Sequence, residues 1–393
     1  MTHGVSLDWL ELPPALDQAR LPMPPSTADF LQLAQLANLL TSLFWGTNDF
    51  YESPENRLAA ARSRGDFRMD YVVARLADDA DAPGRIVGYG FLGLAREPGA
   101  STAEVWVGVH PGFRRRGIGS ALLGEVEAEA LRRGRTTLQS WTDNALVDPA
   151  AVGSGPVFVR GASLETGLTP VVPPAGERPG TGYPAVRSDA PDAAFAAAHG
   201  YGLAQLEWCS VLDLARAAGS ALQVESASTL GEDYELIGWQ GRCPDEYAEP
   251  MADLLGRMTA DAPAGGLEVA PEAWDVERLR AEERAREAIG LSMVTTAALH
   301  RGSGRLAGHS DIETFRDLPQ AAYQGNTLVH PDHRGRRLAL LLKAANVSRL
   351  LRVAPTTQRL YTWTAEENPA ILRANEELGF VPVSTHPGWQ KRL

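Results

Sequence analysis

Two short stretches of the sequence place arginines and glycines at nearly the same spacing. VHPGFRRRGIG occupies residues 109–119, and VHPDHRGRRLA occupies residues 329–339. In each, a β-like apolar run leads into the turn and a run with helical spacing follows it. The first amides of a helix lack partners within the helix, and the helix dipole favours an anion at that end. Each junction is therefore suited to holding a diphosphate.

The residues of the first turn fit this chemistry but do not prove it. Gly117 and Gly119 would let the backbone approach an anion closely. Arg114, Arg115 and Arg116 add positive charge, although such side chains can also simply be solvated. The turn has neither the Walker lysine nor the dinucleotide-binding glycine spacing. A single copy is as consistent with an ordinary basic helix start as with an anion site.

The likeness extends beyond the two turns. Both turns precede an amphipathic helix, a short β-like run, and a helix that ends in glycine and an aromatic residue. The β-like runs are 138–142 and 360–364, and the closing helices are 193–201 and 368–380. A series this long, repeated in the same order, predicts a tandem duplication of an α/β unit.

The duplication predicts the domain organisation. We expect an N-terminal extension at 1–22, a first domain at 23–214 and a second domain at 215–393. The first copy carries an insertion at 143–192 that is rich in proline and glycine, a composition that opposes regular structure. The insertion is interpreted either as a tolerated surface segment or as a lid beside a substrate cleft.

Composition excludes several classes of function. The net charge of −12 argues against a nucleic-acid partner, and two cysteines cannot form a disulfide framework. Residues 30–48 carry no charge, but their glutamines, asparagines and helically spaced leucines (Leu33, Leu36, Leu40, Leu43) predict a buried helix rather than a membrane span. No signal-peptide pattern opens the sequence, so a cytoplasmic location is expected.

The pattern V-x-P-x-x-R-x-x-G-x-G/A resembles the coenzyme A loop of the GCN5-related N-acetyltransferase (GNAT) superfamily. The first copy matches it throughout, whereas the second has Arg337 in place of a glycine. The later Gly200-Tyr201 and Gly379-Phe380 pairs are also similar to the superfamily. The whole resembles tandem actinobacterial acetyltransferases with a mycothiol-synthase-like architecture. This implies an α/β (α+β) fold of two GNAT-like domains, each a mixed curved sheet with splayed central strands and flanking helices.

The resemblance also implies which residues bind the cofactor. Strand residues would pair with pantetheine as an added strand would, and the turns with the first helical residues would hold the diphosphate. In the first copy these residues are Val107, Val109, Arg114, Arg115, Arg116, Gly117, Ile118, Gly119 and Ser120. In the second they are Leu328, Val329, Arg334, Gly335, Arg336, Arg337, Leu338, Ala339 and Asn368. Because its loop is more complete, the first copy is expected to hold coenzyme A.

Catalytic residues are less well indicated. Glu104 lies where the family often places its general base, and Gln324 at the matching position of the second copy cannot serve as one. The family's tyrosine acid is replaced by Ala196 and by Asn375, and Asn375 is retained as a candidate that hydrogen-bonds in the acyl region. His330 and His333 lack further ligands nearby, so no metal is expected.

The predicted function is acyl-CoA-dependent N-acyl transfer, with acetyl-CoA as co-substrate and a primary amine of a small molecule as acceptor. A non-catalytic acyl-CoA-binding or regulatory protein is the alternative, and a mycothiol-synthase-like enzyme is a subsidiary one. No nucleic acid and no membrane is expected as a partner. The oligomeric state is left open, a homodimer included.

Overall fold

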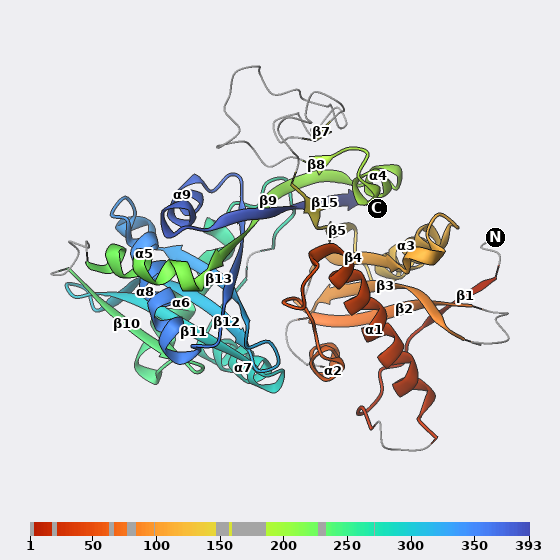
Figure 1. Ribbon diagram of the computed structural model, residues 1–393, viewed down its shortest axis with the longest axis horizontal. Helices are drawn as coiled ribbons and strands as arrows, with labels where there is room; N and C mark the ends of the chain where they lie inside the picture. Colours follow the sequence, from red (N-terminus) through yellow and green to blue (C-terminus); the bar gives the residue numbers. More distant parts are fainter. Residues whose placement is uncertain are drawn as a thin grey trace. The chain divides into compact units, whose positions relative to one another are not determined.

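The computed structural model describes residues 4–17, 22–62, 67–76, 84–97, 99–146, 157–158, 186–226, 233–270 and 272–393. The chain forms two compact units, each built from more than one segment. Unit 1 comprises residues 1–141, 195–202 and 389–393, and unit 2 comprises 142–194 and 203–388. Each unit is a mixed α/β structure whose elements can be followed in Figure 1.

Unit 1 is built on a sheet with the strand order β1-β2-β3-β4-β5. The strands are β1 (Val5–Trp9), β2 (Phe67–Leu76), β3 (Ile86–Ala95), β4 (Thr102–Val109) and β5 (Thr137–Trp141). Neighbours are antiparallel except β4 and β5, which are parallel. The repeat's expected β-like runs are thus strands, and its expected mixed sheet is confirmed.

Helices cover both faces of this sheet. One face packs on α1 (Pro25–Trp45) and α2 (Pro54–Arg62), and the other on α3 (Ile118–Arg132). Phe30 and Leu33 of α1 are fully buried against Tyr71 and Phe91 of the sheet. The prediction of a buried helix here is confirmed with one exception: Leu43 is 59% exposed, because the helix runs past the edge of its core. Within the described residues no helix is long and apolar enough to span a membrane.

Unit 2 contains the strand order β15-β9-β14-β13-β12-β11-β10. The strands of the second repeat are β10 (Tyr234–Gln240), β11 (Leu291–His300), β12 (Arg305–Phe315), β13 (Ala321–Val329), β14 (Arg359–Ala365) and β15 (Val381–Arg392). β9 (Gly202–Asp213) comes from the first repeat and pairs antiparallel with β14. The helices are α5 (Leu214–Ser226), α6 (Asp245–Asp261), α7 (Val276–Ala288), α8 (Leu338–Val353) and α9 (Pro369–Leu378).

The compact units do not follow the order of the repeats. β9 closes the first repeat in sequence, yet residues 203–213 belong to unit 2. Residues 389–393 close the second repeat, yet they belong to unit 1, where the Leu393 amide donates to the Thr136 carbonyl at 2.8 Å. The boundary near 214 describes chain order and remains a prediction, whereas each compact unit takes its last strand segment from the other repeat.

The central strands splay apart in both repeats, as the resemblance implies. β4 pairs with β5 only over 102–104, and β13 pairs with β14 only over 321–323. Beyond these three pairs, each strand leaves its parallel neighbour. The second repeat adds a β-bulge, because Ser310 faces Thr327 while Ile312 faces Gln324, which leaves one extra residue on β13.

Most of the predicted insertion at 143–192 lies outside the described residues. Within it, β6 (Asn144–Ala145) pairs with β15, and β7 (Val157–Phe158) pairs with β8 (Val186–Arg187). The helix α4 (Pro191–Ala198) begins at its end. The interpretations of the insertion as a surface segment and as a lid concern residues outside the described part of the chain. Cys209 and Cys243 are free and buried.

Candidate coenzyme A site

The two predicted turns have the same internal hydrogen bonds. After β4, the Arg114 Nε donates to the Val109 carbonyl at 3.1 Å, and the Gly112 amide donates to the His110 Nδ1 at 3.2 Å. After β13, the Arg334 Nε donates to the Val329 carbonyl at 3.0 Å, and the Asp332 amide donates to the His330 Nδ1 at 3.3 Å. The first arginine of each turn therefore stabilises the loop itself.

Both turns use two left-handed residues before the helix. In the first, these are Arg115 (φ 63°) and Gly117 (φ 79°); in the second, they are Gly335 (φ 78°) and Arg337 (φ 58°). Glycine and arginine have exchanged places between the two positions. Arg337, which departs from the family pattern, keeps the loop conformation at a cost of about 1–2 kcal/mol, since left-handed backbone is unfavourable for a residue with a Cβ.

The helices that follow begin without a side-chain cap. Gly117 precedes α3 and Arg337 precedes α8, and neither caps the first turn with its side chain. The first amides of each helix therefore point outward without a partner in the helix. A diphosphate would supply acceptors for them, and the dipole adds to its attraction.

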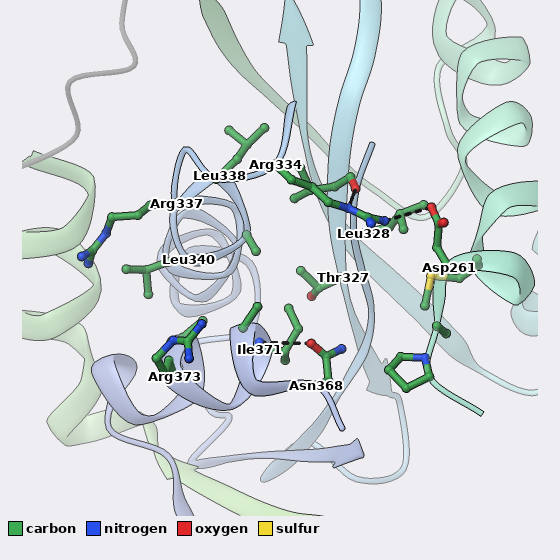
Figure 2. Close-up of a pocket in the computed structure, with 18 of the residues that line it drawn as sticks. Asp261, Thr327, Leu328, Arg334, Arg337, Leu338, Leu340, Asn368, Ile371 and Arg373 are labelled. Atoms are coloured by element: carbon green, nitrogen blue, oxygen red, sulfur yellow. Dashed lines mark hydrogen bonds and ion pairs between the residues drawn. The ribbon is translucent and has the colours of Figure 1, made fainter. Parts of the chain in front are cut away.

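In the second repeat these amides border a cavity of about 440 Å³. Its walls are the end of β13, residues 334–335 and 337–340, the start and one face of α9, and the end of α6 (Figure 2). The part of β13 that lines it no longer pairs with β14. Of the residues predicted in this copy, the following line it: Leu328, Val329, Arg334, Gly335, Arg337, Leu338, Ala339 and Asn368. Arg336 is not among them, and its guanidinium lies 3.6 Å from Asp233.

Three arginines and two carboxylates set the charge of this cavity. Arg334 Nη2 lies 3.0 Å from Asp261 Oδ2 at the end of α6, and Arg337 pairs with Glu377 of α9. Arg373 of α9 makes no ion pair within the described part of the chain. The cavity therefore keeps one uncompensated positive charge, which suits an anionic ligand.

Sequence reasoning missed several of these lining residues. Arg373 lies on α9, the helix that the predicted Asn368 caps, so the prediction of Asn368 could have pointed to it. Asp261 carried no such signal, because α6 lies far from the turn in sequence and reaches it only in the fold. Asn368 acts as the N-cap of α9, since its Oδ1 accepts the Ile371 amide at 3.3 Å.

The first-repeat loop is bordered differently. A Cβ added at Gly119 would lie 3.3 Å from the ring of Phe195 in α4, and the His199 Nε2 lies 3.0 Å from the Ser120 Oγ. Arg116 places its guanidinium 5.1 Å from the centre of the Phe113 ring. Val107, Val109 and Ile118 lie on β4 and at the start of α3, as predicted, and Phe195 and His199 are neighbours that sequence reasoning missed.

Comparison with known proteins identifies the fold. Residues 36–151 match the model of the acetyltransferase (GNAT) family. A tandem GNAT protein from the clavulanic acid biosynthesis pathway, solved without acetyl-CoA, is 27% identical, with 98% of each chain covered and a TM-score of 0.67. The chain has a tandem GNAT fold.

Two further structures support the tandem GNAT fold alone. A GCN5-related N-acetyltransferase from Sphaerobacter thermophilus shares 15% identity over 95% of this chain and 94% of that one, with a TM-score of 0.58. A glucosamine N-acetyltransferase region of a fungal multi-domain β-N-acetylglucosaminidase shares 11% identity at a TM-score of 0.57, covering 98% of this chain and 38% of that one. No curated protein matches by sequence. The likeness to mycothiol synthase is not confirmed.

The two catalytic candidates of this tandem GNAT chain occupy different settings. Glu104 forms the last parallel pair before β4 leaves β5, and burial raises the pKa of its carboxyl, as a general base requires. Asn375 is 4% exposed, and its Nδ2 donates to the Thr364 Oγ1 at 3.1 Å, so its side chain is engaged with β14. Both roles stay predictions. Within the described residues no group of side chains could hold a metal.

Proposed function

We propose that this tandem GNAT chain transfers the acetyl group of acetyl-CoA to a primary amine of a small molecule. The observation that carries the proposal is the cavity in the second repeat, where uncapped helix amides, a splayed strand edge and an unpaired arginine meet. The free edge of β13 suits the amides of pantetheine, and the start of α8 suits the diphosphate. We therefore assign coenzyme A to the second repeat, whereas the loop sequence alone favours the first.

The proposed reaction is direct transfer. The neutral amine attacks the thioester carbonyl, the C–N bond forms, and the C–S bond breaks to release the coenzyme thiolate. A base must first remove one proton from the ammonium form of the acceptor. The second proton that nitrogen loses ends on the departing thiolate, so free coenzyme A thiol accumulates as the amide forms.

A non-catalytic acyl-CoA-binding protein is the second candidate. Asn375, which replaces the family's tyrosine acid, carries a carboxamide, which cannot act as a general acid, and this group is buried and donates to Thr364. Binding of acetyl-CoA without thiol release across a broad amine panel would favour this candidate. Amine-dependent thiol release favours the enzyme.

The site assignment is tested by Ala339→Glu in the second repeat. Two like charges about 4 Å apart near a protein surface repel by roughly 4 kcal/mol, so a carboxylate in the first turn of α8 should weaken acetyl-CoA binding at least about 100-fold. Isothermal titration measures the affinity and the number of sites.

The matched variant is Gly119→Glu in the first repeat, where the resemblance also predicts a coenzyme loop. A loss of one site in Gly119→Glu, with the other retained, would show that both repeats bind. If Ala339→Glu binds as the unaltered protein does while Gly119→Glu does not, the coenzyme belongs to the first repeat and our assignment is wrong.

A further inference from the structure

The two repeats present a carboxylate at the same place from different strands. In the first, Glu104 is the last residue of β4 paired with β5, and its partner across β3 is Gly93. In the second, the last paired residue of β13 is Tyr323, and its partner across β12 is Glu313. Counting along the sequence matches Glu104 with Gln324, but the bulge on β13 shifts the match to Tyr323.

Cross-strand partners project on the same face of a sheet, with Cβ atoms about 4.5–5.5 Å apart. Glu313 therefore emerges on the face that carries Tyr323, beside the point where β13 and β14 separate. That is the position and face which Glu104 holds in the first repeat. The carboxylate thus lies on β4 in the first repeat and on β12 in the second. Glu313 takes the place of Gly93, and Tyr323 takes the place of Glu104.

The surroundings of Glu313 suit a group that exchanges a proton. It is half-buried, and its burial raises the pKa of the carboxyl, with Asp311 acting in the same direction and Arg286 of α7 opposing them. Tyr323, its cross-strand partner, has ring centres of Phe315 and Trp363 at 5.7 and 6.0 Å. Aromatic rings beside a carboxylate favour a cationic ligand.

A second carboxylate, that of Asp311, lies two residues before Glu313 and on the same face of β12. Asp311 lies opposite the bulge, is 5% exposed, and its Oδ1 accepts no hydrogen bond from any described residue. Its Oδ2 lies 3.1 Å from the Nδ1 of the fully buried His309. The neighbouring bulge residue Gly325 lacks a side chain, and a Cβ there would lie 3.4 Å from the Asp311 Cβ. A buried carboxylate oxygen without a donor is costly unless a ligand supplies one.

The first repeat lacks this arrangement. By strand register, Tyr89 and Phe91 stand where the second repeat has His309 and Asp311. Phe91 stacks on Trp106 with ring centres 3.8 Å apart, and both rings belong to the core under α1. β3 and β4 also pair without a bulge. The corresponding face of the first repeat is thus filled by aromatic packing.

We propose that Glu313 is the proton acceptor for acetyl transfer in the second repeat, and that the carboxylates of Glu313 and Asp311 receive a cationic primary amine. The inference rests on the proposed function. The ammonium of the acceptor gives one proton to the Glu313 carboxylate, and its nitrogen then attacks the thioester as described above. Gly325 in the bulge lies against Asp311 and is two residues along β13 from Thr327 of the cavity wall.

The test is Glu313→Gln in the full chain, assayed for amine-dependent thiol release and for acetyl-CoA affinity. We expect kcat/KM to fall at least about 100-fold, the usual effect of losing a general base, with acetyl-CoA affinity unchanged within about twofold. In the unaltered enzyme kcat/KM should rise with pH through a value above that of an ordinary glutamate. In Glu313→Gln this rise of kcat/KM with pH, the rising limb of the pH profile, should be absent. Glu277→Gln, an exposed change on α7, is the matched control.

The outcomes separate the two proposals. If the unaltered protein binds acetyl-CoA but acetylates no amine, the proposed function and this assignment both fail. If Glu313→Gln turns over at the unaltered rate, or if only Glu104→Gln loses activity, the assignment of Glu313 alone fails. Should Glu313→Gln not fold, Glu313→Asp keeps the carboxylate. It should retain the pH limb at a reduced rate, and a profile without that limb would overturn the assignment.

Discussion

At the scale of the residue, Lys343 is an ionisable side chain buried inside the second repeat. It lies on α8, is 1% exposed, and places its Nζ 5.4 Å from the centre of the Phe380 ring. Burial lowers its pKa from 10.5 to about 7. The equivalent residue of α3, counted from the start of each helix, is the buried Leu123. The first repeat thus shows that an uncharged leucine fits at this position of the helix.

Lys343→Leu should therefore remove a pH dependence of stability. Between about pH 7 and 10.5 the unfolded chain binds a proton that folded Lys343 does not, so the free energy of unfolding rises with pH across this window. The full effect is on the order of 5 kcal/mol. Urea unfolding at several pH values should give a steeper rise for the unaltered protein than for Lys343→Leu. Parallel curves would show that the lysine is protonated when folded.

At the scale of the element, α9 joins a capping function to the wall of the cavity. Asn368 caps α9, while Ala370, Ile371 and Ala374 line the cavity from the same helix. A cap and a ligand contact make different demands on the side chain. Aspartate can cap a helix as well as asparagine, but it cannot donate a hydrogen bond to a pantetheine carbonyl.

Asn368→Ala should lower the free energy of unfolding by about 1 kcal/mol, because it removes an N-cap. Asn368→Asp should preserve stability. If Asn368 also donates to the coenzyme, Asn368→Asp should weaken acetyl-CoA binding about tenfold, since one hydrogen bond is lost and a like charge is added. Melting curves and titration calorimetry measure the two effects separately. Unchanged affinity in Asn368→Asp would restrict Asn368 to its cap.

At the scale of the molecule, unit 1 depends on the last five residues of the chain. Trp389 is fully buried, and the Lys391 Nζ lies 2.9 and 2.8 Å from the two carboxylate oxygens of Glu127 in α3. Glu127 also accepts from the hydroxyl of Tyr201 at 3.0 Å. The first repeat therefore does not contain all of its own core.

Truncation after Gly388 should destabilise unit 1 by at least about 3–5 kcal/mol, the range for losing a buried tryptophan. Limited proteolysis should then cut within residues 1–141 sooner than in the full chain. Lys391→Ala, which removes the ion pair and the contact of the ammonium with the Tyr201 ring, should cost about 1 kcal/mol, because the pair is partly solvated. Equal protease resistance after truncation would mean that the first repeat folds without its borrowed segment.

Local motifs could be predicted from the sequence, whereas the pairing of strands that lie far apart in the chain could not. The two turns, their helices and the glycine stops follow from local spacing, so β5, β14, α3, α8 and α9 were predicted correctly. The GNAT-like fold followed from the same motifs. The exchange of glycine and arginine between the left-handed positions could not be read, because it depends on backbone angles at Arg115 and Arg337.

The tertiary structure alone decided which residues share a site. One extra residue on β13 moved the partner of Glu313 from the position that sequence counting indicates, because register depends on pairing between strands. The end of α6 meets the turn at Arg334 although the two lie far apart in the sequence, and β9 pairs with β14 rather than within its own repeat. Sequence specifies such contacts only through the energy of the whole fold, which no local pattern encodes.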